Sequence, residues 1–225
     1  MAKAKRLNVY NSQKIFNFKI REPLVRKKVT IDNYKEVDKA LLQFIGEQDE
    51  FIPERDSEEY RVYYNPDMPY DFLIRLIDYG GLVEVITTSS LPISLIDKMV
   101  SFPRNCFVTY TVKDEYTEKE IMNIQQSSAG LKTSIYIETD DDVDSYTILT
   151  SLADIPFIID QVIIRYRGHD YGIQYEMFND IRDALSGWKM AIVFETWDKK
   201  QRKYMIKRKE VDEKIRKSST VWKKK

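Results

Sequence analysis

The sequence predicts an α/β fold in which parallel strands form a partial (β/α)6–7 barrel or an open sheet. Two observations carry this prediction. Short β-rich segments alternate with helical patterns along most of the chain, and such alternation implies parallel strands joined by right-handed crossovers. The chain has 225 residues, of which 43% are hydrophobic, which favours one core with appendages over two domains.

The first unit is a short strand that ends at Val29–Ile31, followed by a helix over Tyr34–Gly46. Asp32 or Asn33 is the expected cap of this helix. Its apolar residues recur at helical spacing: Val37, Leu41, Leu42 and Ile45.

The second unit is a strand over Tyr60–Tyr64 and a helix over Tyr70–Asp78, which Gly80 and Gly81 end. Further strands are expected at Leu82–Thr87, Cys106–Val112, Leu131–Ile137, Gln161–Tyr166 and Lys189–Phe194. Further helices are expected at Ile93–Ser101, Thr117–Ala129, Asp142–Ala153 and Gln174–Ser186. About seven strands are too few for a closed eight-stranded barrel, so an incomplete barrel and an open doubly wound sheet are the alternatives.

The net charge of zero divides into three regions of unlike charge. Residues 1–28 hold nine Lys or Arg and one acid, and residues 198–225 hold thirteen Lys or Arg and four acids, which leaves 14 basic and 31 acidic residues for 29–197. We therefore predict an acidic β/α domain over 29–197 with a basic N-terminal arm and a basic helical tail. The apolar residues of the arm suit packing as a strand or helix across the open edge of the barrel.

Basic ends of this kind bind nucleic acid or another polyanion, or lie on an acidic surface of the same chain or of a partner. Without base-reading elements, contacts to nucleic acid would be salt-sensitive and tolerant of sequence. The candidate contact residues in the tail are Lys199, Lys200, Arg202, Lys203, Lys207, Arg208 and Lys209.

The composition limits cofactors and location. With Cys106 and His169 as the one cysteine and the one histidine, the chain cannot form an intramolecular disulfide, a four-cysteine zinc site or a cysteine-ligated iron–sulfur cluster. We expect no cofactor, although carboxylates are compatible with magnesium. No apolar run approaches the roughly 20 residues of a membrane span, and no apolar segment follows the basic start, so we expect a cytoplasmic protein without membrane contact.

In the segment from Tyr60 to Lys113, an Asn65-Pro66-Asp67 bend precedes a helix, and the next strand ends in the polar loop Thr87–Ser90. This layout resembles the radical-SAM superfamily. The resemblance covers roughly residues 29–195 and implies a partial (β/α)6 barrel. The family's CxxxCxxC loop and Gly-Gly-Glu motif are missing, so the resemblance implies a barrel without the cluster and its radical chemistry. A β/α fold of independent origin is the alternative.

Sites in parallel β/α folds lie at the carboxyl ends of the strands, and the segment Arg165–Asp170 is the sharpest candidate there. Strand alternation places Ile163, Arg165 and Arg167 on one face, so that the two guanidiniums can bind an anion together with Lys113. Histidine is a common general acid or base, and the candidate catalytic residues are His169, Asp170, Glu138 and Asp67. The alternative is that the arginines pair with acids such as Glu138 and Glu195.

An acidic cluster follows the same strand as Glu138. It comprises Glu138, Asp140, Asp141, Asp142 and Asp144. Such carboxylates can hold magnesium together with Asp67 or Glu195. They can also cap the following helix and complement its dipole.

No phosphate-binding glycine loop, HExxH or GxSxG motif occurs in the chain. Our leading hypothesis is a non-catalytic or catalytically degenerate radical-SAM-like barrel that acts as a subunit or adaptor and whose basic ends contact nucleic acid or an acidic partner. The Lys-, Ile- and Tyr-rich, Gly-poor composition suits a phage or mobile-element gene, which would place the protein in the host cytoplasm or virion. The alternatives are a cluster-free enzyme for a phosphate- or carboxylate-bearing substrate and a structural component of a larger assembly.

Overall fold

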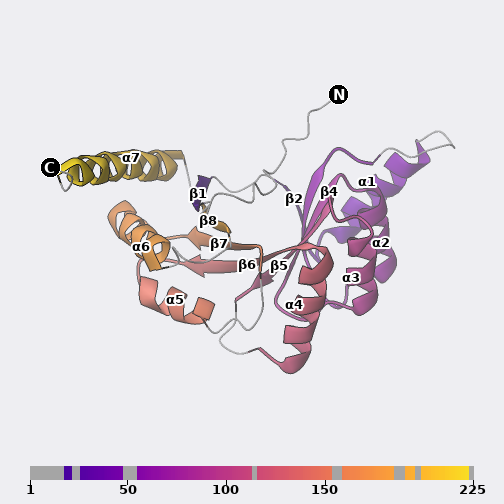
Figure 1. The fold of residues 1–225 in the computed structure, drawn as a ribbon. Coiled ribbons are helices and arrows are strands. Elements are labelled where there is room, and N and C mark those ends of the chain that lie inside the picture. The colour runs from indigo at the N-terminus through magenta and orange to yellow at the C-terminus, as the bar shows by residue number, and fades with distance from the viewer. Residues whose placement is uncertain are drawn as a thin grey trace.

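The described strands form one eight-stranded parallel sheet, and the helices lie outside it (Figure 1). The computed structural model describes residues 18–21, 26–47, 55–112, 116–153, 159–184, 191–195 and 199–222, without the side chains of 18–21 and 216–222. This architecture confirms the predicted α/β class with parallel strands.

The elements alternate in chain order from the second strand onward. The strands are β1 (Phe18–Arg21), β2 (Lys27–Val29), β3 (Glu59–Tyr63), β4 (Leu82–Thr87), β5 (Cys106–Thr111), β6 (Lys132–Thr139), β7 (Gln161–Tyr166) and β8 (Ala191–Glu195). The helices are α1 (Tyr34–Gly46), α2 (Tyr70–Tyr79), α3 (Ile93–Val100), α4 (Glu118–Gly130), α5 (Ser145–Ala153), α6 (Tyr171–Ala184) and α7 (Lys199–Trp222).

The sheet order shows that the sheet must curve. The order is β1-β8-β7-β6-β5-β4-β3-β2, so β1 and β2 lie at opposite edges although Arg21 and Lys27 are only six residues apart. A chain of that length reaches at most about 22 Å, whereas the edges of a flat sheet of this width would lie about 34 Å apart. The sheet therefore rolls into an incomplete barrel whose two edges approach each other.

Alternation along each strand divides the side chains between two faces. Val85, Val108 and Ile135 lie on the outer face and are fully or almost fully buried beneath helix residues such as Leu95 and Phe178. Each such side chain contributes about 1.5–3 kcal/mol on burial. The main core therefore lies between the helices and the convex face of the sheet, and the concave face is left to other residues.

Helix starts depend on side chains that the turns provide. Asn33 occupies the N-cap position of α1, one of the two predicted positions, but its side chain makes no cap hydrogen bond, because its Oδ1 accepts the Thr30 N–H at 2.7 Å and its Nδ2 donates to the Lys28 carbonyl at 2.9 Å. Thr117 and Glu120 form a capping box at α4, close to the predicted start.

Two further helices begin away from the predicted residue. Helix α5 begins at Ser145, after the predicted Asp142, because the Asp144 Oδ1 accepts the Thr147 N–H at 2.7 Å. Helix α6 begins before the predicted Gln174, since the Asp170 Oδ1 accepts the Gly172 N–H at 2.7 Å. A carboxylate that accepts the first free N–H groups fixes where each helix starts.

The two basic ends contribute to the same body. Strand β1 lies in the predicted N-terminal arm and pairs with β8, whereas residues 1–17 of the arm lie outside the described residues. The predicted tail helix is α7, which contacts α6 and β1 and extends away from the barrel (Figure 1). The Tyr175 hydroxyl bonds to Asp212 at 2.6 Å, and the rings of Tyr171 and Tyr204 lie 5.7 Å apart. No helix in the described ranges is long and apolar enough to cross a membrane.

A buried amide joins α4 to the loop before α3, and its removal should destabilise the fold. The Asn123 side chain accepts the Leu91 N–H at 2.9 Å, donates to the Leu91 carbonyl at 2.6 Å and accepts from the Tyr110 hydroxyl at 3.1 Å. We expect Asn123→Ala to lower the free energy of unfolding by about 3 kcal/mol, because it leaves buried polar groups unpaired. Urea denaturation would measure this loss. Gln125→Ala, at an exposed position of the same helix, should change stability by less than about 0.5 kcal/mol, and equal losses in both variants would contradict the assigned role.

Candidate functional site

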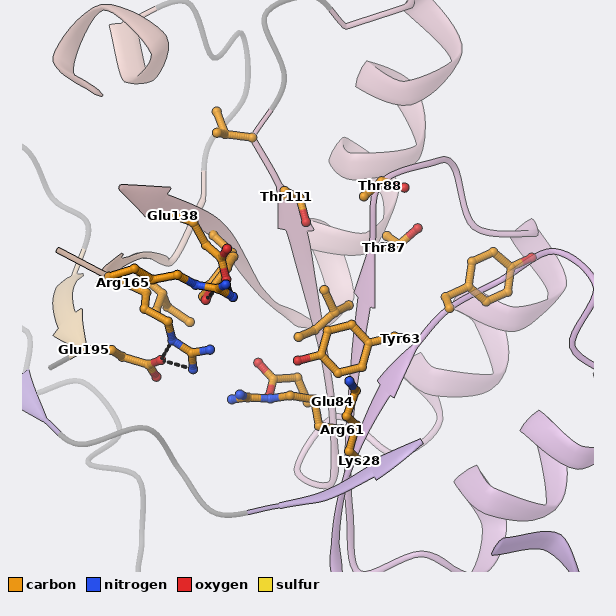
Figure 2. A pocket seen from close by; sticks show the side chains of 16 residues that line it. Lys28, Arg61, Tyr63, Glu84, Thr87, Thr88, Thr111, Glu138, Arg165 and Glu195 are labelled. Atoms are coloured by element: carbon orange, nitrogen blue, oxygen red, sulfur yellow. Dashed lines mark hydrogen bonds and ion pairs between the residues drawn. The ribbon is translucent and has the colours of Figure 1, made fainter. Parts of the chain in front are cut away.

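The concave face of the sheet encloses a polar cavity of about 600 Å³, lined from every strand between β2 and β8 or the residues that follow them (Figure 2). This volume lies in the range of small-molecule sites. Closed parallel barrels instead fill this space with layers of branched apolar side chains. The charged residues that line the cavity are Lys28, Arg61, Arg165, Arg167, Glu84, Glu138 and Glu195.

Glu84 is the most enclosed charge on the β2 side of the cavity. Arg61, its direct neighbour on β3, donates to it from Nε at 2.8 Å, and the Thr109 hydroxyl donates at 2.9 Å. Arg26, which precedes β2, also donates to this carboxylate. Burial alone would raise the pKa of Glu84, but the guanidiniums of Arg26 and Arg61 hold it below its ordinary value. The carboxylate therefore stays ionised at neutral pH.

A second ion pair lies on the other side of the cavity. The Arg165 Nη2 donates to the Glu195 Oε2 at 2.7 Å, and the Glu195 side chain is only 1% exposed. The Arg165 guanidinium also lies 5.4 Å from the ring centroid of Tyr136. Burial would lower the pKa of Arg61, but Glu84 beside it and Glu195 from β8 raise it. Arg61 on β3 and Glu195 on β8 line the same cavity, so these two strands face one another across it (Figure 2).

The charged side chains nearest to solvent form weaker interactions than the two buried ion pairs. Arg167 donates to Glu138 at 2.6 Å, but these side chains are 52% and 40% exposed, and such pairs contribute about 0–1 kcal/mol. The Tyr136 hydroxyl donates to the same carboxylate at 2.8 Å. Burial is the main cause that raises the pKa of Tyr136 far above its ordinary value, so the phenol remains a hydrogen-bond donor. The exposed Lys28 lies with Nζ 5.1 Å from the Tyr63 ring centroid.

The structure confirms how the sequence placed the two arginines. Ile163, Arg165 and Arg167 all line the cavity, as alternation predicts. The alternative pairing is also confirmed, because Arg165 pairs with Glu195 and Arg167 with Glu138. The cavity thus receives both guanidiniums together with their carboxylate partners.

The other candidate catalytic residues are not brought into this cavity. His169 and Asp170 are exposed on the loop before α6, and neither lines the cavity. Asp67 is exposed in the turn before α2, where its N–H bonds to the Asn65 Oδ1 at 2.8 Å. Of the four candidates, Glu138 alone is among the cavity residues of the described chain. Lys113 lies outside the described residues.

The carboxylate of Asp141 holds the loop that contains His169 outside the cavity. It accepts the Tyr166 hydroxyl and the backbone N–H groups of His169 and Asp170. These hydrogen bonds lower the pKa of Asp141. The bond from the Tyr166 hydroxyl has the largest effect, and the bond from the His169 N–H the next largest. A Cβ at Gly168 would collide with this carboxyl group, so the close approach requires glycine.

The acidic cluster therefore serves local structure. Asp144 caps α5, as one interpretation predicted, and Asp141 organises the neighbouring loop. Across the described ranges, no group of three His, Cys, Asp or Glu side chains is placed to hold a metal ion. Cys106 belongs to the buried core, and burial raises the pKa of its thiol to about 12.

The sequence analysis did not identify the charged residues on the β2 side of the cavity. Arg61 and Glu84 each lie between two buried apolar or aromatic residues of a strand, and Arg26 directly precedes β2. A charged residue flanked by buried strand residues was the signal, because such a charge must find a partner on the same face. Arg61 and Glu84 lie inside their strands, whereas the rule for parallel β/α folds points to residues at the strand carboxyl ends.

No protein-family model and no curated protein matches the chain. A fold of this class hosts many unrelated activities. The interpretation of the site therefore rests on the chemistry of its side chains.

Replacement of Glu84 should reveal the buried charge network. Glu84→Gln would leave Arg26 and Arg61 without their common carboxylate, and we expect a loss of about 3–5 kcal/mol in the free energy of unfolding. The pKa of Glu84 is lowered by folding from an ordinary value of 4.5. Its stabilising contribution is therefore complete above that value and is lost as the pH falls through the folded pKa.

The measurement is urea denaturation at several pH values between neutrality and strong acid. The stability difference between the natural protein and Glu84→Gln should shrink below about pH 4.5. The matched control is Glu58→Gln, because Glu58 is 49% exposed and pairs with Lys27 at 2.8 Å, and it should cost less than about 1 kcal/mol. A difference that does not change with pH would show that Glu84 is not the charged partner.

Proposed function

We propose that the concave cavity binds a small polar molecule that carries a carboxylate or phosphate group. The observation that carries this proposal is the charge of the cavity. Among the described lining residues, four are basic (Lys28, Arg61, Arg165 and Arg167) and three are acidic (Glu84, Glu138 and Glu195). A concave site with convergent polar groups and an excess of cations suits an anionic ligand.

The four basic side chains of the cavity differ in burial, and we assign them different roles in ligand binding. Arg61 and Arg165 are largely buried, and each is held by a nearly buried carboxylate, so they form the framework of the site. Lys28 and Arg167 are exposed. An anionic ligand can replace the weak partner Glu138 on Arg167, because a guanidinium binds carboxylate and phosphate in the same bidentate geometry. The hydroxyls of Thr88 and Thr111 line the same cavity and supply further donors.

Binding is favoured over catalysis as the activity of this cavity. The exposed loop residue His169 lies outside the lining, which removes the most suitable general acid or base from reach of a bound ligand. A cluster-free enzyme remains the alternative proposal, with Glu138 and the phenol of Tyr136 as its proton-transfer groups inside the cavity.

We also propose that the barrel is a radical-SAM-like domain that lacks the iron–sulfur cluster. The open parallel barrel supports this proposal. The single cysteine, Cys106, begins β5 at the opposite end from the strand carboxyl ends, where it is unsuited to ligate a cluster in the cavity. A β/α barrel of independent origin accounts for the same topology.

Removal of the exposed guanidinium tests the cavity proposal. We expect pyrophosphate or citrate to bind the natural protein in isothermal titration calorimetry, and Arg167→Ala to weaken this binding about 10- to 100-fold, because a hydrogen-bonded charge contributes about 1.5–3 kcal/mol. Stability should change little, since the Arg167–Glu138 pair is exposed.

The matched control is Arg75→Ala. Arg75 on α2 pairs with Asp38 at 2.8 Å outside the cavity, so its replacement should leave the affinity unchanged. The proposal fails if neither anion binds the natural protein or if both variants weaken binding equally.

The basic helix α7 supports a second proposal, in which the protein is a subunit or adaptor that holds nucleic acid or an acidic partner. Lys199, Lys200, Arg202, Lys203 and Lys207 are exposed along it. Of the other two candidate residues, Arg208 lies over the Tyr175 ring at 5.5 Å, and the Lys209 Nζ lies 4.0 Å from Glu213. The Lys- and Ile-rich composition supports a phage or mobile-element origin for such a subunit.

The salt dependence of DNA binding tests the nucleic-acid form of this proposal. We expect the triple variant Lys199→Gln, Lys203→Gln, Lys207→Gln to flatten the slope of log affinity against log salt by about 2.7, because each lost phosphate contact removes about 0.9. Fluorescence anisotropy with labelled double-stranded DNA at several salt concentrations would measure the slope. The control variant Lys35→Gln, Lys39→Gln, Lys119→Gln removes three exposed lysines from other helices, and an equal effect in that variant would argue against a contact through α7.

A further inference from the structure

The edge of the barrel at the strand carboxyl ends carries a series of exposed apolar side chains. Because all strands are parallel, helices α2 to α6 begin along this one edge. Each of them exposes one large apolar residue within its first five positions: Tyr70 (42%), Ile93 (60%), Met122 (69%), Tyr146 (75%) and Ile173 (40%). Exposed apolar residues are common one by one, but a series along one edge is typical of an interaction surface.

The same edge is acidic. Exposed carboxylates stand in its loops and first helical turns at Asp67, Asp71, Glu118, Asp140, Asp142 and Asp144. We call these carboxylates and the five apolar residues the acidic edge. Its chemistry suits a partner that presents basic and apolar side chains together.

Helix α7 presents such a surface. Lys199, Arg202, Lys203 and Lys207 recur at the spacing that places them on one side of a helix, and Ile206, which is 37% exposed, lies among them. We call these five residues the basic stripe. A different side of α7, with Gln201 and Met205, is buried in its own chain. The basic stripe therefore faces away from the body to which α7 is attached.

We propose that the basic stripe of one copy of this chain docks on the acidic edge of a second copy. This inference rests on the second proposed function, that α7 binds an acidic surface, and it identifies that surface. Within one copy, the side of α7 opposite the basic stripe packs on α6 and β1, through the bond between Tyr175 and Asp212 and the contact of Tyr171 with Tyr204, so the stripe is turned away from the acidic edge of its own chain. The contact is therefore made between molecules.

The observations favour a second copy over nucleic acid as the occupant. Ile206 in the stripe and the apolar residues of the edge match each other, whereas a phosphate backbone offers them no apolar partner. The acidic body also repels a polyanion, since residues 29–197 hold 14 basic and 31 acidic residues.

The contact joins two different surfaces, so after the first contact forms one copy retains a free edge and the other retains a free stripe. Such head-to-tail contacts produce rings or open chains rather than a closed two-fold dimer. Because the contact joins exposed charges, salt weakens it. Mass should therefore increase with protein concentration and decrease with ionic strength.

The experiment measures the mass of the full chain by sedimentation velocity over a series of protein concentrations at about 50 and 300 mM salt. We expect association at low salt that is at least tenfold weaker at high salt. A natural protein that stays monomeric under both conditions would overturn the proposal.

Two charge-reversed variants identify the surfaces. The helix variant carries Lys199→Glu, Lys203→Glu and Lys207→Glu, and the edge variant carries Glu118→Lys, Asp140→Lys and Asp142→Lys, all at exposed positions. Each variant alone should be monomeric, because its stripe and edge then have charges of the same sign. An equimolar mixture should associate again, because each reversed surface meets its complement in the other variant.

Restored association in the mixture supports the proposal and also shows that both variants are folded. Association of either variant alone to the natural extent, or a mixture that stays monomeric while both variants keep the natural circular dichroism spectrum, would overturn it. DNA binding that the helix variant loses, in a protein that does not self-associate, would uphold the second proposed function and reject the second copy as occupant.

Discussion

The buried carboxylate of Glu84 is the constraint on which the concave side of this protein depends. A charge that is almost fully removed from water must be compensated by hydrogen-bonded partners of opposite charge. Arg26 before β2, Arg61 on β3 and Thr109 on β5 provide that compensation. One side chain thus links the edge of the sheet to its centre and makes the inner face polar where parallel barrels are usually apolar.

The ion pairs of the cavity are of two kinds. Buried pairs hold the shape of the cavity, and an exposed pair is available to a ligand. The pairs of Glu84 and Glu195 are shielded from water, so the loss of either partner leaves an uncompensated charge and the geometry is held firmly. Arg167 and Glu138 are about half exposed, and water screens their attraction. A site built in this way keeps its shape while one of its cations exchanges partners.

Charge is also separated on the scale of the whole molecule. The body is acidic, the carboxyl edge of the barrel concentrates exposed carboxylates beside apolar residues, and α7 carries the opposite charge on the side that faces away from the body. Intramolecular neutralisation is prevented because α7 is fixed through its other side by Tyr171, Tyr175 and their partners. The cavity and the basic helix therefore support separate proposals, one for a small ligand and one for a macromolecular partner.

The class of fold and the position of most elements were predictable from the amino-acid sequence, because these depend on local periodicity. The helix Tyr34–Gly46 and the strand Gln161–Tyr166 were predicted with the bounds that the structure has. The face shared by Ile163, Arg165 and Arg167 was also predictable, since alternation is a property of a single strand. Helix starts were less accurate where a carboxylate such as Asp144 or Asp170 selected them.

Which side chains come together in the cavity depends on contacts between distant parts of the chain. The short connection between Arg21 and Lys27 joins opposite sheet edges, and the resulting curvature brings Arg61 and Glu195 into the lining of the same cavity. The Asp141 carboxylate holds the loop of His169 on the surface, outside the cavity. Neither result is readable from spacing along the chain, because strand order and the choice of hydrogen-bond partner are long-range properties, whereas periodicity reports only the face on which a residue lies.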